Sequence, residues 1–164
     1  NGKGHAITSA KKYVKTSHVA IHDADLEYFP EDLAFMWERV DKYTNSLILG
    51  SRFIGSRSRK NLYKRTYLAN KVMSLFFSLI HLYKVSDVAT CYKLFPNKFL
   101  QSINIYEKGF SIEIELLSKF LKFNRSILEV PIKYEGRSYS EGKKINSKDG
   151  ILYLVNTIKY RFFT

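Results

Sequence analysis

Hydrophobic positions recur along the chain with two different periods. Apolar residues spaced three and four apart predict five helices, over residues 4–16, 30–40, 64–83, 110–123 and 151–163. Short apolar runs predict strands over residues 18–22 and 46–53, within 87–95, and over 125–136. Because helices and strands alternate, the pattern predicts an α/β fold with a parallel or mixed sheet.

Two of these strands carry further expectations. Val19, Ala20 and Ile21 form a short apolar run, which is typical of a buried strand. Pro131 interrupts the last strand and has no N–H to donate, so this strand is expected at an edge of the sheet or at a bulge. We find no repeat, linker or low-complexity tract, and therefore expect a single domain over residues 1–164.

Composition agrees with a globular protein. The chain has 164 residues, of which 45% are hydrophobic, and this is enough for one domain with a core. The single cysteine, Cys91, excludes an internal disulfide and fits a reducing compartment. A lone cysteine of this kind is most often a small buried hydrophobic residue.

The net charge of +12 predicts attraction to an anionic partner, which could be nucleic acid, an acidic membrane surface or a phosphorylated ligand. The most apolar segment, residues 72–83, is shorter than the roughly 20 residues that span a bilayer. The first residues, NGKGHA, have the character of a loop that enters a helix. We therefore expect that an N-terminal part of the natural protein is absent.

Two aspartates follow the first strand with one residue between them. Asp23 and Asp25 precede a helix start marked by Pro30, so they lie at the carboxyl edge of the sheet, where α/β proteins bind ligands. Paired carboxylates suit Mg²⁺ or Mn²⁺ that also holds substrate phosphates. On spacing alone, a solvated turn or a helix cap is an equal alternative. Glu27 is either a third metal ligand or an acid of the first helical turn.

Basic residues near loops and element ends are candidates for binding phosphate. Arg offers two parallel donors to an anionic oxygen pair, whereas the alternative for any one basic residue is a solvated surface position. The candidates are Arg52, Arg65, Arg137 and Lys143.

Several motifs together resemble a known family. They are NGKGHA, HDADLEYFPEDL, LILGSRF, SDVATCYKLF and VPIKYEGRSYSEGKKI, in this order. The chain is similar over nearly its whole length to family-2 glycosyltransferases of the dolichol-phosphate mannose synthase and polyprenyl-phosphate sugar transferase type. The resemblance implies a GT-A nucleotide-sugar-binding fold, with a mixed, mostly parallel sheet and flanking helices. It also implies that the first strands are missing, roughly 60 residues that carry the nucleobase site.

The same resemblance assigns roles to individual residues. Asp23 and Asp25 would hold Mg²⁺ or Mn²⁺ on the donor diphosphate, with Glu27 as a further ligand. Lys3 would lie near the nucleotide, and Asp87 near the acceptor. The arginines Arg52, Arg65 and Arg137 would receive the donor diphosphate and the acceptor phosphate, with Lys143 as a further basic contact.

The implied reaction is an inverting, metal-dependent transfer of a sugar from a UDP- or GDP-sugar to a polyprenyl phosphate. The implied location is cytoplasmic and peripheral, on the cytoplasmic face of a membrane. The helix over 64–83 fits this location, because basic residues precede an apolar stretch as in interfacial helices, although a core helix is an equal alternative. Other acceptors, such as a soluble or cell-wall saccharide, stay open, and a basic nucleic-acid-binding module is a weaker alternative.

Overall fold

The computed structural model describes residues 2–60, 63–137 and 147–163. In chain order the elements are α1 (Lys3–Lys11), β1 (His18–Ile21), α2 (Pro30–Trp37), β2 (Leu47–Ser51), β3 (Arg59–Lys60), α3 (Lys64–His81), β4 (Lys93–Pro96), α4 (Asn97–Ser102), α5 (Ile112–Phe123), β5 (Ile127–Pro131), β6 (Tyr134–Glu135) and α6 (Ser147–Phe162).

The main sheet has four strands in the order β1-β4-β2-β5. Strand β4 runs antiparallel to both of its neighbours, whereas β2 and β5 are parallel. β1, β2 and β5 therefore point the same way and β4 alone is reversed, which confirms the mixed, mostly parallel sheet. The short strands β3 and β6 pair separately.

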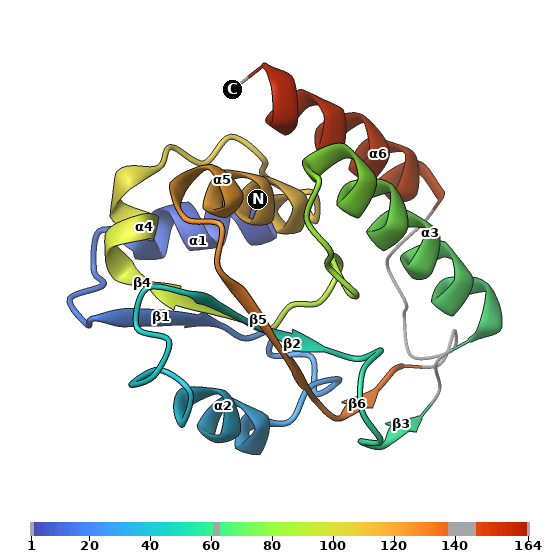
Figure 1. Cartoon of the computed structure of the whole chain (residues 1–164), viewed down its shortest axis with the longest axis horizontal. Helices are drawn as coiled ribbons and strands as arrows, with labels where there is room; N and C mark the ends of the chain where they lie inside the picture. The colour runs from blue at the N-terminus through green and yellow to red at the C-terminus, as the bar shows by residue number, and fades with distance from the viewer. Residues whose placement is uncertain (1, 61–62, 138–146, 164) are drawn as a thin grey trace.

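Helices cover both faces of the sheet (Figure 1). α2 lies on one face, and α1, α4 and α5 lie on the other. α3 and α6 lie side by side at one end of the molecule, and α6 also contacts α5. Such flanking helices are the arrangement that the alternation of helices and strands predicts.

The core forms where α5 packs over the central strands. Strand β2 is buried along its whole length, as a strand covered on both faces should be. The inner face of α5 contributes Ile112, Leu116, Leu117, Phe120 and Leu121, all of which are buried. A core of this kind gives the neighbouring loops a rigid base.

Several predicted boundaries were wrong. α1 ends at Lys11 rather than at residue 16, because turns follow in which Tyr13 and Val14 each donate to the carbonyl three residues earlier, those of Ala10 and Lys11. Ala20 in β1 is exposed, since β1 is an edge strand that pairs only with β4 within the described sheet. α6 begins at residue 147 rather than at 151.

The segment 87–95 was predicted as one strand, but only its end belongs to β4. Residues 87–92 instead form a buried loop, because their polar groups bond to other parts of the chain: the Cys91 N–H donates to the Tyr28 hydroxyl. Helix α4 was not predicted. β5 lies at the edge of the main sheet and ends at Pro131, as its proline indicated.

Candidate active site

The reversed strand brings four segments to one edge of the sheet. Asp23 follows the carboxyl end of β1, Arg52 follows β2, and Arg137 lies beyond β5. Because β4 runs the opposite way, the loop that precedes it, with Cys91, reaches the same edge. These residues line a cavity of about 810 Å³, which also extends along α3 and α6. The edge where α/β sheets bind ligands is therefore hollowed here.

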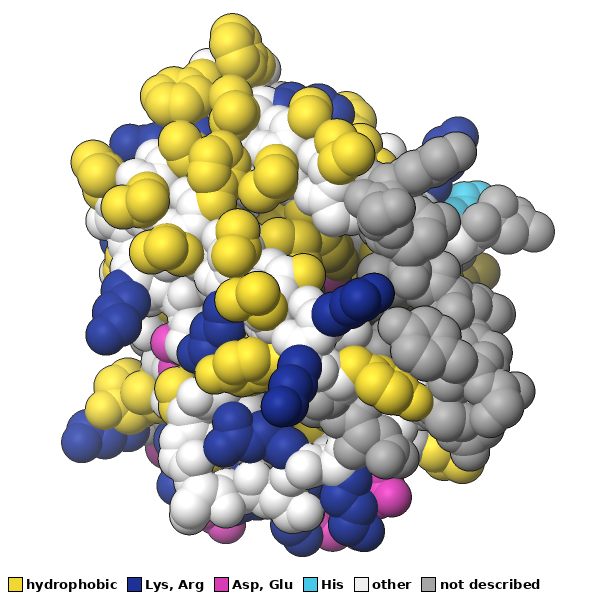
Figure 2. All heavy atoms as spheres, turned by 90° about the vertical axis from the view of Figure 1, so that its right-hand side faces the viewer, with side chains coloured by type: hydrophobic (Ala, Val, Ile, Leu, Met, Phe, Trp, Pro, Cys, Tyr) yellow, Lys and Arg dark blue, Asp and Glu magenta, His cyan; other side chains and the backbone are white. Residues whose placement is uncertain are grey.

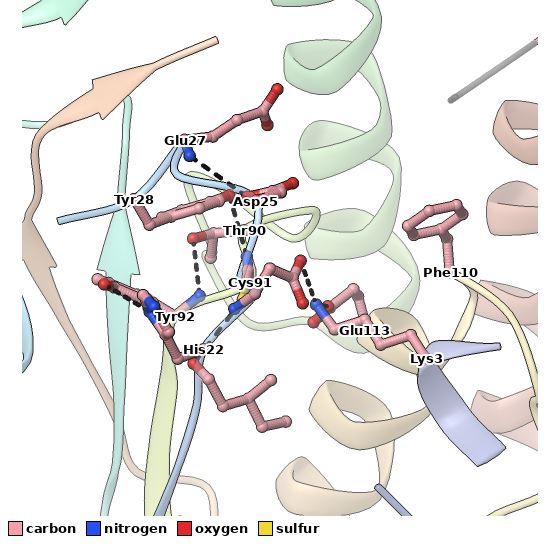
Figure 3. Close-up of polar contacts among 12 residues, drawn as sticks. Lys3, His22, Asp25, Glu27, Tyr28, Thr90, Cys91, Tyr92, Phe110 and Glu113 are labelled. Carbon is pink, nitrogen blue, oxygen red and sulfur yellow. Dashed lines mark hydrogen bonds and ion pairs between the residues drawn. The ribbon is translucent and has the colours of Figure 1, made fainter. Parts of the chain in front are cut away.

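A tight turn after β1 presents the two aspartates. The Asp23 N–H donates to Cys91 Sγ at 3.1 Å. Asp25 Oδ1 accepts from the Glu27 N–H at 3.3 Å (Figure 3). Leu26, between Asp25 and Glu27, takes a left-handed conformation, with φ of 64°. Both aspartates line the cavity with partly exposed carboxylates, so they are open to a ligand.

Lys3 is the cation beside Asp23. Its Nζ lies 2.9 Å from Asp23 Oδ2 and 2.5 Å from Glu113 Oε1. The start of α1 is fixed by Gly4, whose N–H donates to the Lys108 carbonyl at 2.9 Å. A Cβ at Gly4 would lie 1.8 Å from the Glu107 carbonyl oxygen, so only glycine fits there. The glycine thus permits the approach that delivers Lys3 to the site.

Arg137 is the cation beside Asp25 and Glu27. Its Nη2 lies 3.0 Å from Asp25 Oδ2, and its Nε lies 3.2 Å from Glu27 Oε1. The Arg137 N–H also donates to Glu27 Oε1, while the Tyr134 hydroxyl donates to Glu27 Oε2 at 2.9 Å. Glu27 is therefore engaged by Arg137 and Tyr134, and in this arrangement it does not converge with the two aspartates.

The aspartate pair suits a divalent cation that is also bound by a phosphorylated ligand. Within residues 2–60, 63–137 and 147–163, no three acidic, His or Cys side chains are grouped so that they could hold a metal ion alone. Mg²⁺ in nucleotide sites, however, needs only one or two carboxylates, because phosphates and water complete its shell. Two partly exposed carboxylates that line a cavity of about 810 Å³, with room for a phosphorylated ligand, fit that donor set.

Arg52 and Asp87 form a buried pair below the cavity. Arg52 Nε and Nη2 each lie 2.8 Å from an Asp87 oxygen, and the Arg52 N–H donates to the same carboxylate at 3.0 Å. Arg52 lines the cavity, but Asp87 is fully buried and does not. Asp87 therefore meets the cavity only through Arg52, which its two oxygens hold in place, and its nearness to an acceptor stays a prediction.

The remaining predicted residues differ in their placement. Arg65, in the first turn of α3, is exposed and lines the cavity, whereas Lys143 lies outside the described residues. Cys91 is buried, and this burial raises the pKa of its thiol to about 12, so the thiol stays protonated and is no nucleophile at neutral pH.

Sequence reasoning missed Glu113 and Tyr134 in the site. Glu113 lines the cavity from the first turn of α5 and is 2% exposed. The signal was present in the sequence, because helical spacing places Glu113 on the same face as Leu116, Leu117 and Phe120. Tyr134 gave no such signal, since buried tyrosines are common.

Apolar side chains of α3 and α6 form a surface that we name the α3–α6 ridge (Figure 2). Its exposed members are Leu68, Val72, Leu75, Leu79, Ile151, Leu152, Val155, Ile158 and Phe162. The opposite face of α3 packs into the core through Phe77. The helix therefore has one exposed apolar face and one core face. Within the described residues, no helix has the length and hydropathy needed to cross a bilayer.

Two curated relatives resemble the chain at the level of sequence. It is 24% identical over 128 residues to a polyprenol monophosphomannose synthase of Mycolicibacterium smegmatis, covering 76% of this chain and 48% of the relative. It is 25% identical over 124 residues to an undecaprenyl-phosphate mannosyltransferase of Micrococcus luteus, covering 74% and 50%. The chain thus spans about half the length of these relatives.

Among solved structures, the chain resembles glucosyl-3-phosphoglycerate synthase of Mycobacterium tuberculosis in complex with Mn²⁺, UDP-glucose and phosphoglyceric acid. The TM-score is 0.70 at 15% identity, over 96% of this chain and 55% of the other. This likeness confirms the GT-A fold. Residues 1–103 match the sequence model of the family described as glycosyl transferase family 2. With most of its length covered by that match, the chain belongs to glycosyl transferase family 2.

Proposed function

We propose that residues 1–164 form the catalytic domain of an enzyme that transfers a sugar from a UDP- or GDP-sugar to a polyprenyl phosphate, with inversion. One observation carries the proposal: a single cavity joins the aspartate pair and three arginines to apolar side chains of α3 and α6. Such a cavity suits an acceptor with a phosphate at one end and a hydrocarbon chain at the other. One curated relative is named for the synthesis of polyprenol monophosphomannose, and the other for mannosyl transfer with undecaprenyl phosphate.

Cationic side chains would receive the donor diphosphate. Arg52 is held in place by Asp87, and Arg65 is exposed at the start of α3, where the helix N-terminus also favours anions. Asp23 and Asp25 would hold Mg²⁺ or Mn²⁺, which neutralises charge on the departing diphosphate. Lys3 and Arg137 now pair with these aspartates, so they are the groups that would exchange carboxylate partners for phosphates.

In the proposed reaction, an oxygen of the acceptor phosphate forms a bond to the anomeric carbon. The bond from that carbon to the diphosphate oxygen breaks on the opposite side, and the nucleoside diphosphate leaves with the electron pair. A phosphate nucleophile is anionic at neutral pH, so a strong general base is not required. Arg52 and Arg137 would stabilise the growing negative charge, and Asp87 would act as a positioning residue for Arg52.

The α3–α6 ridge gives the acceptor a route. Leu68 and Val72 belong both to the ridge and to the cavity lining, as does Ile151 of α6. Basic side chains lie next to the ridge in Figure 2, and such a combination suits an anionic membrane surface. We propose a peripheral location on the cytoplasmic face of a membrane, where the prenyl chain could pass from the bilayer into the cavity.

A water-soluble acceptor is the second candidate, since the M. tuberculosis structure is named for phosphoglyceric acid. The apolar lining along α3 and α6 favours the lipid. A nucleic-acid groove is disfavoured, because Tyr92, Phe95 and Phe99 are buried and cannot stack on bases.

Acceptor choice tests the proposal. Full-length protein with Mn²⁺ is given UDP- or GDP-linked sugars and either a short-chain polyprenyl phosphate, the unphosphorylated prenol or a soluble saccharide. We expect transfer only to the phosphate. The variant Val72→Asp should weaken use of the lipid, whereas Tyr13→Asp, at an exposed site outside the cavity lining, is the matched control. Equal transfer to the soluble saccharide would refute the lipid acceptor.

A further inference from the structure

A line of four charged side chains runs from the core to the aspartate turn. Lys93 of β4 is completely buried, and its Nζ donates to Glu113 Oε2 and to the Thr90 carbonyl. Glu113 in turn contacts Lys3 through Oε1 at 2.5 Å (Figure 3). Lys3 contacts Asp23 at 2.9 Å. The line thus alternates in sign and ends on a candidate metal ligand.

One carboxylate therefore lies between two ammonium groups. Lys93 does not line the cavity that the described residues form, so its charge meets a ligand only through Glu113. Buried charges are costly unless they are paired and hydrogen-bonded, and Glu113 provides a partner for both lysines.

The backbone of Lys3 has little freedom to move. Gly2 and Gly4 pack so closely on residues 107–109 that a Cβ at Gly2 would lie 2.5 Å from the Lys108 carbonyl oxygen. The Lys3 ammonium can therefore change partners only by rotation of its own side chain. Its two possible carboxylate partners are Asp23, at the cavity, and Glu113, below it.

We infer that Glu113, fixed by Lys93, is a positioning residue for Lys3 that keeps this ammonium paired when Asp23 turns to a divalent cation. The inference rests on the proposed function. With Glu113 present, Asp23 can leave Lys3 without stranding a buried charge. Without it, Asp23 is the only carboxylate that the described residues leave for Lys3, and the ammonium competes with the metal for it.

Binding of Mn²⁺ alone, followed by electron paramagnetic resonance of the free ion, tests this role of Glu113 in the full-length protein without any turnover. We expect Glu113→Gln to weaken Mn²⁺ binding about 10-fold, because Lys3 then stays on Asp23. Lys3→Met should not weaken it. In the Lys3→Met background, the added Glu113→Gln should change the affinity less than about 2-fold, since the competitor is gone.

Glu113→Gln leaves Lys93 unpaired in the core and could unfold the protein. The double variant Lys93→Met with Glu113→Gln removes both buried charges, so it restores stability while leaving Lys3 with Asp23 alone. It should therefore bind Mn²⁺ as weakly as a folded Glu113→Gln protein. Wild-type affinity in this double variant, or equal losses with and without Lys3, would overturn the inference alone. Absence of Mn²⁺ binding by the wild type, both alone and with a nucleoside diphosphate present, would overturn the metal assignment and the inference together.

Discussion

The site contains two arginine–carboxylate pairs that share their chemistry and differ in their surroundings. Arg52 is 6% exposed and its partner Asp87 is 0% exposed. Arg137 is 32% exposed and its partner Asp25 is 26% exposed. The first pair is made of two hydrogen bonds of 2.8 Å from one side chain to one carboxylate, whereas Arg137 divides its donors between two acids.

This difference assigns the pairs different tasks. Breaking a buried pair leaves an uncompensated charge in the core, which is strongly destabilising. A pair near water contributes little to stability, so it can open when a better ligand arrives. We therefore propose that Arg52 is a fixed anion receptor and that Arg137 is a cation that can be released.

The largest effect is expected for the buried pair. Asp87→Asn keeps the shape but removes the charge that holds Arg52, and it should lower the free energy of unfolding by about 3 to 5 kcal/mol. Denaturant unfolding of wild type and variant measures this change. A loss below about 1 kcal/mol would mean that the pair resembles a surface contact.

Arg137 should show the opposite profile. Arg137→Ala should raise the barrier to transfer by about 2 to 4 kcal/mol, roughly 30-fold to 1,000-fold in rate, with almost no change in stability. Arg137→Lys should also be damaging, because a point charge cannot replace a planar two-pronged donor. Steady-state kinetics at saturating Mn²⁺ and polyprenyl phosphate provide the test. Wild-type turnover in both variants would reduce Arg137 to a surface residue.

A bound metal ion should change the chemical reactivity of Arg137 and leave that of Arg52 unchanged. If Mn²⁺ takes Asp25 from Arg137, the freed guanidinium should react several-fold faster with phenylglyoxal, while Arg52 stays unreactive in its buried pair. Peptide mapping by mass spectrometry reports both sites in one sample. Asp25→Ala is the control, because Arg137 should then be reactive with or without Mn²⁺. Equal rates for Arg137 in wild type with and without metal would contradict release.

The smallest effect concerns salt. At low ionic strength, Arg137→Ala should cost less than about 1 kcal/mol of unfolding free energy, and this difference should vanish in about 1 M NaCl, where the Debye length is about 3 Å. The cost of Asp87→Asn should persist. If both differences respond alike to salt, burial does not distinguish the pairs.

The sequence predicted the regular parts of the fold well, because they depend on local periodicity. Helices α3 and α5 and strand β2 lie where their apolar spacing placed them. The prediction of a strand over 87–92 was wrong for a physical reason. The segment is as buried as a strand, but its backbone groups form hydrogen bonds with the side chains of Tyr28 and Lys93 instead of with a neighbouring strand. Burial can be inferred from composition, whereas the partner of a backbone group cannot.

The candidate site was predicted in its membership more than in its contacts. Asp23, Asp25, Arg52 and Arg65 line the cavity as the motifs indicated. The partners of these residues come from distant segments, so the sequence did not reveal that Asp87 holds Arg52 or that Glu113 lies beside Lys3. Pairings of this kind are a property of the reversed strand β4 and of the loops that it positions.

The close packing of Gly4 on residues 107–109 has a consequence for the order of folding. Lys3 is 110 positions from Glu113 in the chain, and Asp25 is 112 from Arg137. Contacts between such distant residues must await closure of very long loops, so they form late, after local helices have appeared. During synthesis, the contact between Lys3 and Glu113 cannot form until α5 has left the ribosome. We therefore expect the scaffold to fold before the site and to pass through a state without a working centre.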